Sequence, residues 1–171
     1  MTKLYSICKE GNVSSASDII GKIQSIFNPN ACDSNGYTYL YYASESGNVA
    51  MVAYLINEHK VKVDTKISGF SDGTALMKAV SCGHLDVINY LIEECKADIT
   101  MKNNKGNSIL FFAAQSGNID LLKFLLRTIT DSAINDANSK GITCLMEASR
   151  TGNLEMVSML IGCEGKKMKT Y

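Results

Sequence analysis

The chain has 171 residues, 46% of them hydrophobic and 20% charged, and its 17 basic and 17 acidic residues give a formal net charge of zero. This length fits one domain. The balanced charge argues against general binding to nucleic acid or anionic membranes, because both require a surplus of basic residues. No apolar run is long enough to span a membrane, and the chain starts without a charged-then-apolar leader. We therefore expect a cytoplasmic protein, with the nucleus as the alternative location, that has no membrane and no nucleic-acid partner.

One segment recurs through the chain at intervals of 34 to 36 residues. In each copy a Thr or Ser is followed by Leu two residues later, by Gly nine residues later and by an apolar pair seventeen residues later. Self-similarity at such a period indicates a stacked repeat array. The copies open at Thr2, Thr38, Thr74, Ser108 and Thr143 and contain Gly11, Gly47, Gly83, Gly117 and Gly152.

Each copy predicts two short antiparallel helices. The Thr or Ser suits an N-cap, and the Gly supplies the left-handed conformation that ends the first helix. A second helix follows, with Asp86, Asp120 or Glu155 in its first turn, where a carboxylate meets the positive end of the helix dipole. Such a pair cannot bury both faces alone, so each copy needs its neighbours. Polar, turn-rich segments predict projecting hairpins or extended loops between the copies, at residues 33–36, 103–106 and 138–141.

The copies differ along the chain. The first, residues 1–32, has Ile7 where the others have Ala, and its serines give it the polar exterior of a terminal cap. The second, residues 33–66, is rich in tyrosine, and the third, residues 67–102, has its loop glycine, Gly73, one residue late. The fourth is residues 103–137. The fifth, residues 138–171, has a second helix as apolar as the internal ones, so we expect either a longer array or a contact that covers this end.

The repeated pattern, in which Gly is followed by Asn or His and then by the apolar second helix, resembles the ankyrin repeat. The family's usual Thr-Pro-Leu-His becomes Thr-Tyr-Leu-Tyr, Thr-Ala-Leu-Met, Ser-Ile-Leu-Phe and Thr-Cys-Leu-Met here. Proline at the first helical turn is favoured but not required, so its loss lowers stability without changing the fold. The resemblance implies one all-α domain over residues 1–171, an ankyrin-repeat solenoid of five stacked antiparallel helix pairs with projecting β-hairpin loops.

The sequence offers no catalytic arrangement, metal site or cofactor-binding motif. His84 occupies the family's Gly-His position, where it is structural, and His59 is interpreted as a solvated residue at a helix end. Six cysteines at irregular spacings, without C-x-x-C, are expected to be free thiols, with Cys8 and Cys144 as small apolar fillers. We therefore expect no enzyme activity, no cofactor, no metal and no small-molecule substrate.

In ankyrin-like stacks the loop tips and the ends of the first helices line a concave groove that typically binds a folded protein. Tyr37 and Phe70 are predicted to be its anchors, because exposed aromatic residues tend to dominate interface energy. Tyr39, Tyr41, Tyr42, Phe111 and Phe112 are expected to pack mostly between helices. Carried over to this chain, the groove residues are Ser34, Asn35, Tyr37, Glu45, Ser46, Phe70, Ser71, Ser81, Cys82, Asn104, Lys105, Asn107, Gln115, Ser116, Ser139, Lys140, Ile142, Arg150 and Thr151.

The function predicted from the sequence is a non-enzymatic protein–protein interaction module, monomeric on its own, that binds a protein partner through this groove. One alternative is a structural subunit of a larger assembly that docks through the uncapped C-terminal repeat. Another is the ankyrin array of a longer signalling protein. The frame does not identify the partner, because function depends on the groove and not on the fold.

Overall fold

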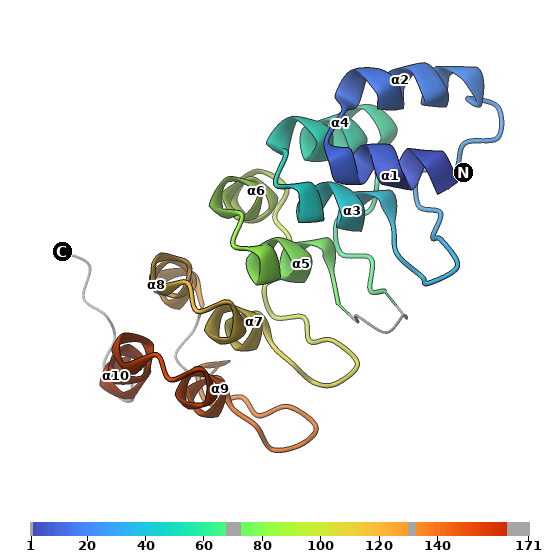
Figure 1. Cartoon of the computed structure of the whole chain (residues 1–171). Coiled ribbons are helices and arrows are strands. Elements are labelled where there is room, and N and C mark those ends of the chain that lie inside the picture. Colours follow the sequence, from blue (N-terminus) through green and yellow to red (C-terminus); the bar gives the residue numbers. More distant parts are fainter. Residues whose placement is uncertain (1, 68–72, 130–132, 164–171) are drawn as a thin grey trace. The chain divides into compact units, whose positions relative to one another are not determined.

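The structure, a computed structural model, describes residues 2–67, 73–129 and 133–163. These residues form α-helices joined by loops, without a β-sheet, so the fold is all-α as predicted (Figure 1). The chain divides into two compact units, Met1–Asp98 and Ile99–Tyr171, here called unit 1 and unit 2. Each unit is built from consecutive helix pairs and is considered on its own.

Unit 1 contains three helix pairs. Within it α1, α3 and α5, the first helices of the pairs, pack on one another in one layer, and α2, α4 and α6 form the second layer. The last helix continues from α6 directly into a π-helical turn, η1. The elements are α1 (Thr2–Glu10), α2 (Val13–Lys22), α3 (Tyr39–Ser46), α4 (Val49–His59), α5 (Ala75–Cys82), α6 (Leu85–Asn89) and η1 (Tyr90–Glu94).

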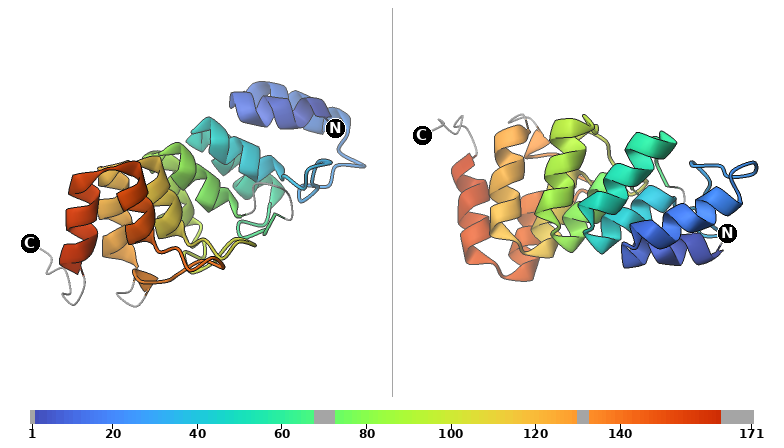
Figure 2. Two further views of the ribbon diagram at one scale, coloured as in Figure 1. Left: turned by 60° about the horizontal axis from the view of Figure 1, so that its bottom comes forward. Right: turned by 90° about the horizontal axis from the view of Figure 1, so that it is seen from above.

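Unit 2 contains two helix pairs with the same arrangement. Its first helices, α7 (Ile109–Ser116) and α9 (Cys144–Thr151), pack on each other, and so do the second helices, α8 (Ile119–Thr128) and α10 (Leu154–Cys163). The loops that precede α7 and α9 project from the same end of these pairs (Figures 1 and 2). This arrangement places loop residues next to the first helices, as the repeat pattern predicts.

The predicted caps define the first helix of the pairs. The hydroxyl oxygens of Thr38, Thr74 and Thr143 each accept a hydrogen bond from the backbone N–H three residues later, at 3.2–3.3 Å. Ser108 occupies the same position without a side-chain capping bond. The glycines that follow α3, α5, α7 and α9 have φ between 70° and 76°, the left-handed conformation that ends the helix.

The Asn after this glycine joins one helix pair to the one before it. Asn48 Oδ1 accepts a hydrogen bond from the N–H of Met51 and caps α4, while its Nδ2 donates to the carbonyl oxygen of Gly11 at 3.0 Å. In unit 2, Asn153 makes the corresponding bond to Gly117 at 3.3 Å. His84 takes this place in the third pair, with Nε2 3.0 Å from the carbonyl oxygen of Glu45. The structural role predicted for His84 is thus supported by its contact.

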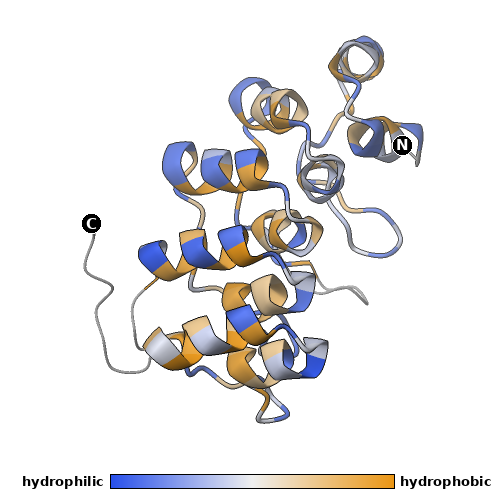
Figure 3. Cartoon of the chain, turned by 60° about the vertical axis from the view of Figure 1, so that its left-hand side comes forward, coloured by the Kyte–Doolittle hydropathy of each residue, from blue (hydrophilic) through white to orange (hydrophobic). Residues whose placement is uncertain are grey.

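The repeated apolar positions form the core of each unit, and hydrophobic residues lie on the helix faces that meet other helices (Figure 3). The Tyr5 and Tyr39 rings stack in unit 1 with centroids 4.3 Å apart, and Tyr39 is fully buried. The six cysteines form no disulfide with one another, as predicted. Cys8 and Cys144 fill buried positions as predicted, and burial raises the pKa of their thiols to about 12 and about 11.

Three loops share one five-residue turn. The side-chain Oδ1 of its first residue, Asp33, Asn103 or Asn138, accepts hydrogen bonds from the N–H groups two and four residues later. The fourth residue is a glycine with φ of 76–83°. Backbone hydrogen bonds between the first and fifth residues close each turn like a hairpin. An antiparallel bridge also joins Cys32 to Thr38 around the first loop, and a similar bridge joins Ile67 to Gly73 in the loop before α5. The tip of the loop before α5 lies outside the described residues.

The interpretation of His59 as a solvated residue is wrong. Its ring is half-buried at the end of α4 and makes edge contacts with Phe27 and Tyr54, at centroid distances of 5.3 and 4.8 Å. Its Nε2 is buried and has no hydrogen-bond partner among the described residues. Burial lowers the pKa of His59 and outweighs the opposing effect of Glu58. His59 is partly buried by Phe27, which is far away in the sequence, so its position at a helix end did not reveal the burial.

Candidate partner-binding surface

The surface of unit 1 has a hollow of about 570 Å³ beside the loop that precedes α3. Its walls come from α1, through Tyr5, Ser6 and Lys9, and from the loop itself. Ser34 and Asn35, two of the predicted groove residues, are exposed at the loop tip and line this hollow. The remaining lining residues are Cys32, Asp33 and Tyr42.

The Asp33 carboxylate fixes the loop of unit 1. Its Oδ1 accepts backbone hydrogen bonds from Asn35 and Tyr37, each at 2.9 Å, and its Oδ2 accepts the Tyr42 hydroxyl at 2.8 Å. Burial opposes ionisation, but these hydrogen bonds lower the pKa of Asp33 below its ordinary value. The hydroxyl of Tyr42 correspondingly has its pKa raised to about 12, first by burial and then by the bond to Asp33. The loop is therefore held in one shape near neutral pH.

Tyr37 forms part of an aromatic cluster beside this loop. Its ring stacks on Tyr41, with centroids 4.7 Å apart and planes inclined by 12°, and makes an edge contact with Tyr42 at 5.8 Å. Tyr37 is half-buried, so one part of it is available to a partner. Tyr39 and Tyr41 are buried and Tyr42 is half-buried, in line with the expected packing between helices. Phe70 and Ser71, the other predicted contacts near this point, lie outside the described residues.

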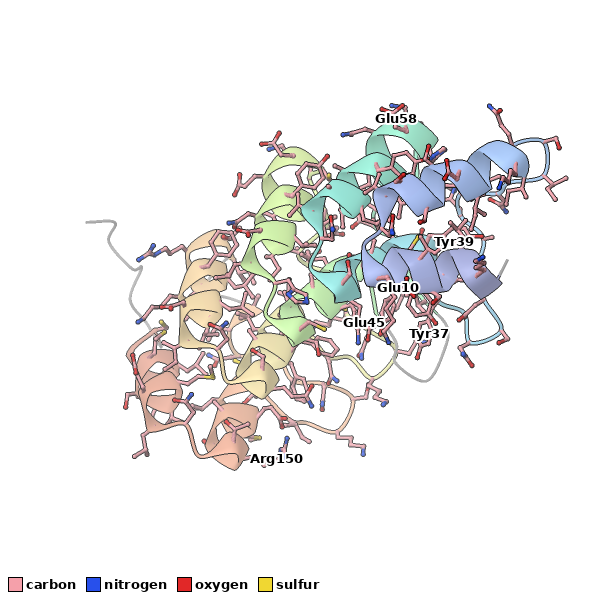
Figure 4. The ribbon with its side chains drawn as sticks, turned by 45° about the horizontal axis from the view of Figure 1, so that its top comes forward. Glu10, Tyr37, Tyr39, Glu45, Glu58 and Arg150 are labelled. Carbon is pink, nitrogen blue, oxygen red and sulfur yellow. The ribbon has the colours of Figure 1, made fainter. Side chains whose placement is uncertain are left out.

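Glu45 links three successive first helices of unit 1 on the same side as Tyr37 (Figure 4). One carboxylate oxygen lies 3.2 Å from the Lys9 Nζ of α1, and the other lies 2.8 Å from the Lys78 Nζ of α5. The Lys78 ammonium also lies 5.5 Å from the centroid of the Tyr41 ring. Burial would raise the pKa of Glu45, but the two ammonium groups lower it. The cations on this face are thus already engaged by one carboxylate.

Unit 2 has a hollow of about 460 Å³ between its two loops and the first helices α7 and α9. Most of its lining residues carry polar side chains, and many of them are exposed. Among the ten groove residues predicted in this part of the chain, eight line this hollow: Asn104, Lys105, Asn107, Gln115, Ser139, Lys140, Ile142 and Arg150. Phe111, Asn138 and Glu147 complete the lining.

The two loops of unit 2 are joined to each other. The backbone N–H of Ser139 donates to the carbonyl oxygen of Lys105 at 2.9 Å, and Asn138 Nδ2 donates to Asn107 Oδ1 at 2.8 Å. Gly106 permits this approach, because a Cβ built there would lie 2.9 Å from the Ser139 nitrogen. The tips therefore act as one wall of the hollow, and Lys105 and Lys140 are held on neighbouring loops.

A bidentate ion pair lies at the α9 side of the hollow. Arg150 Nε donates to Glu147 Oε2 at 3.0 Å, and its Nη2 donates to Oε1 at 2.6 Å. The Glu147 side chain is 5% exposed and that of Arg150 is 66% exposed. The bonds from Arg150 outweigh burial and lower the pKa of Glu147. Glu147 is therefore ionised near neutral pH and committed to Arg150, whose outer edge faces solvent (Figure 4).

Other predicted groove residues are placed differently. The hydroxyls of Ser46, Ser116 and Thr151 donate to backbone carbonyls of their own helices, three residues back, at 2.7–2.8 Å. They stabilise the helix ends. Ser81 and Cys82 are exposed at the end of α5 and do not line either of these hollows.

The register of the repeat did not identify several lining residues. Tyr5, Ser6 and Lys9 were assigned to a terminal cap, although they form a wall of the hollow in unit 1. Glu147 lies in the apolar run of its helix. Its spacing of three residues from Arg150 could have predicted the ion pair, because residues one helical turn apart lie side by side. Phe111 was expected in the core and is 9% exposed at the base of the second hollow.

The described residues that line the two hollows include no group of side chains suited to a metal ion. Across residues 2–67, 73–129 and 133–163 there is no group of three or more His, Cys, Asp or Glu side chains that could hold a metal ion. In the same part of the chain, every helix is too short or too polar to traverse a bilayer. Most of the residues that line the two hollows carry polar side chains.

The family comparison agrees with this architecture. A family model described as ankyrin repeats (3 copies) matches residues 4–103 and again residues 76–170, so together the matches extend over nearly the whole chain. No curated protein matches the chain. The capped helix pairs, the glycine-ended first helices and the projecting loops are therefore those of a known repeat, and the chain belongs to the ankyrin-repeat family, whose repeats are generally protein–protein interaction modules.

Proposed function

We propose that this protein is a non-enzymatic interaction module that binds a protein partner through its loop tips and first helices. One observation carries the proposal: eight of the ten groove residues expected in unit 2 line one hollow. Loop tips joined by hydrogen bonds lose little conformational freedom on binding, which favours affinity. The lining combines the polar side chains of two loops with the apolar Ile142 and Phe111, which suits the mixed surface of a protein segment.

The test is capture of a partner from native cell extract by the immobilised chain, followed by mass spectrometry. The variant Tyr37→Ala with Phe70→Ala removes the two predicted anchors, and Ile26→Ala, at a position 68% exposed, removes an apolar side chain that lines neither hollow. We expect a stoichiometric partner to be lost with the double variant and kept with Ile26→Ala. Thermal melting of each variant separates loss of contact from loss of folding. A partner retained equally by all three proteins would contradict binding through these anchors.

A second candidate function rests on the last helix pair. Met146, Leu154 and Ile161 of α9 and α10 are 56%, 80% and 54% exposed. Exposed apolar side chains on one helix pair favour a permanent contact, as in a structural subunit of a larger assembly. Light scattering of the purified chain is the measurement. Self-association that Leu154→Lys with Ile161→Lys abolishes would support this function, whereas a monodisperse monomer would support a module that acts alone.

A further inference from the structure

We propose that the hollow of unit 2 receives an acidic segment of the partner, one whose Asp or Glu side chains meet Lys105 and Lys140. This inference rests on the proposed function, since it describes the partner of that same surface. It is carried by the charges of the hollow, by the way its loops are fixed and by the contrast with unit 1.

The charge of the hollow is positive and largely uncompensated. Lys105, Lys140 and Arg150 contribute cations, and Glu147 is the acidic residue in the lining. Both oxygens of Glu147 are occupied by Arg150. The two lysines are exposed and have no ion-pair partner within residues 99–129 and 133–163. A carboxylate placed between them would therefore gain charge-assisted hydrogen bonds without displacing an existing partner.

The cations are positioned before any ligand arrives. The bonds from Ser139 to Lys105 and from Asn138 to Asn107 join the two loops at their tips. Within each loop, the Oδ1 atoms of Asn103 and Asn138 hold the turn through two backbone N–H groups. The backbone that carries the two lysines is therefore fixed before binding, and the lysine side chains are ordered when a ligand binds.

The corresponding surface of unit 1 differs. There Lys9 and Lys78 share Glu45, and Asp33 is bound by backbone N–H groups and by Tyr42. Tyrosine rings and internally paired charges dominate that surface, and unpaired cations mark the hollow of unit 2. The two units thus select different features of a partner: apolar and aromatic groups in one, and negative charge in the other.

The lining of unit 2 favours a peptide over nucleic acid. Gln115 is an exposed amide that can bond a peptide backbone, and the half-buried Ile142 offers an apolar contact for a side chain. Single-stranded nucleic acid is generally held by bases stacked on exposed aromatic rings, and Phe111, the aromatic residue of this lining, is 9% exposed.

The experiment uses a phage library that displays random dodecapeptides, selected for binding to the immobilised whole chain. Fluorescence-anisotropy titration then measures the affinity of the selected peptides. We expect enrichment of Asp and Glu. Lys105→Glu with Lys140→Glu should weaken binding roughly tenfold or more, since two exposed attractions become repulsions. The matched control is Lys22→Glu with Lys62→Glu, which makes the same charge change at exposed lysines of unit 1 outside both hollows and should leave binding within about twofold. Replacing the acidic residues of a selected peptide by Lys should restore its binding to the Lys105→Glu, Lys140→Glu variant.

Three results of the peptide experiment would overturn the inference. They are selection of neutral or basic peptides, equal binding by the Lys105→Glu, Lys140→Glu variant, and failure to select any peptide. The first leaves the proposed function intact if capture of the partner from extract still depends on Tyr37 and Phe70, so the two failures can be told apart. A fluorescent dodecauridine titrated in parallel tests the other source of negative charge. If it binds more tightly than the selected peptides and loses binding in the same variant, the hollow recognises phosphate and the peptide assignment is wrong.

Discussion

Asn48 shows how one side chain can both start a helix and join it to its neighbour. Its oxygen caps α4, and its amide nitrogen donates to the carbonyl oxygen of Gly11 in the preceding pair. His84 makes only the second kind of bond, because its ring does not cap α6. In unit 1 the successive pairs are thus connected by polar contacts at the surface as well as by the apolar residues between them.

Leu91 tests the apolar register at a single position. It is fully buried in η1, at a place that the repeat assigns to the core. Leu91→Ala should lower the free energy of unfolding by about 2–5 kcal/mol, since it removes buried methyl groups and leaves a cavity. Urea denaturation measures this loss, with Leu154→Ala, at an 80% exposed position, as the control expected within about 0.5 kcal/mol of wild type. A loss below about 1 kcal/mol at Leu91 would contradict the register.

His59 makes a prediction about pH. Because burial lowers its pKa in the folded chain below the ordinary value of 6.5, the unfolded chain binds the proton more tightly. Stability from the neutral ring is therefore fully present above pH 6.5 and is lost as the pH falls through that value towards the folded-state pKa.

His59→Phe keeps a ring beside Phe27 and Tyr54 but removes the titrating group. We expect wild type to lose stability between pH 7.5 and pH 5.5 and the variant to lose less, with little change at pH 7.5. Chemical denaturation at the two pH values decides the matter. Parallel losses in both proteins would show that His59 is not the responsible group.

At the scale of elements, the five-residue loop contributes most of the exposed residues that line the two hollows. Its shape depends on the first residue, whose Oδ1 holds two N–H groups, and on the glycine at the fourth position. Gly106 and Gly141 have nearly equal φ of 77° and 76° but different surroundings. A Cβ at Gly106 would meet Ser139 at 2.9 Å, whereas a Cβ at Gly141 would lie more than 4 Å from the other described residues, its two chain neighbours aside.

This pair of glycines separates backbone strain from loop contact. Either Gly→Ala substitution forces a side chain into the left-handed region, which costs about 1–2 kcal/mol. Gly106→Ala should be more destabilising than Gly141→Ala, because it also pushes apart the two loop tips. Thermal unfolding compares the two variants with wild type. Equal losses of stability would mean that the bond between Ser139 and Lys105 has no energetic role.

At the scale of the whole chain, the repeat pattern predicted the family, the fold class, the capping threonines and most of the lining in unit 2. These follow from local rules, since a cap, a glycine or a periodic apolar face is determined by residues nearby in the sequence. The number of five repeats and their boundaries stay predictions, because the family match does not count them.

What could not be predicted depends on contacts distant in the sequence. The burial of His59 requires Phe27, the wall formed by Tyr5 requires the loop before α3, and Lys78 meets Glu45 from another repeat. Tyr37 was expected to be an exposed anchor, but its stacking on Tyr41 leaves it half-buried. The hydroxyl of a residue such as Ser46 can bond either a ligand or the backbone of its own helix, and the sequence does not distinguish the two. In the structure Ser46 donates to its own helix.

The shared loop has a consequence for how such a protein can acquire new partners. Its turn is fixed by positions one and four, and the fifth residue makes internal contacts, as Tyr37 does with Tyr41 and Asn107 with Asn138. The second and third residues are exposed and can be exchanged without rebuilding the backbone: Ser-Asn after Asp33, Asn-Lys after Asn103 and Ser-Lys after Asn138. Each loop therefore offers two replaceable residues, at which natural selection or an engineer can change recognition while the scaffold is inherited unchanged.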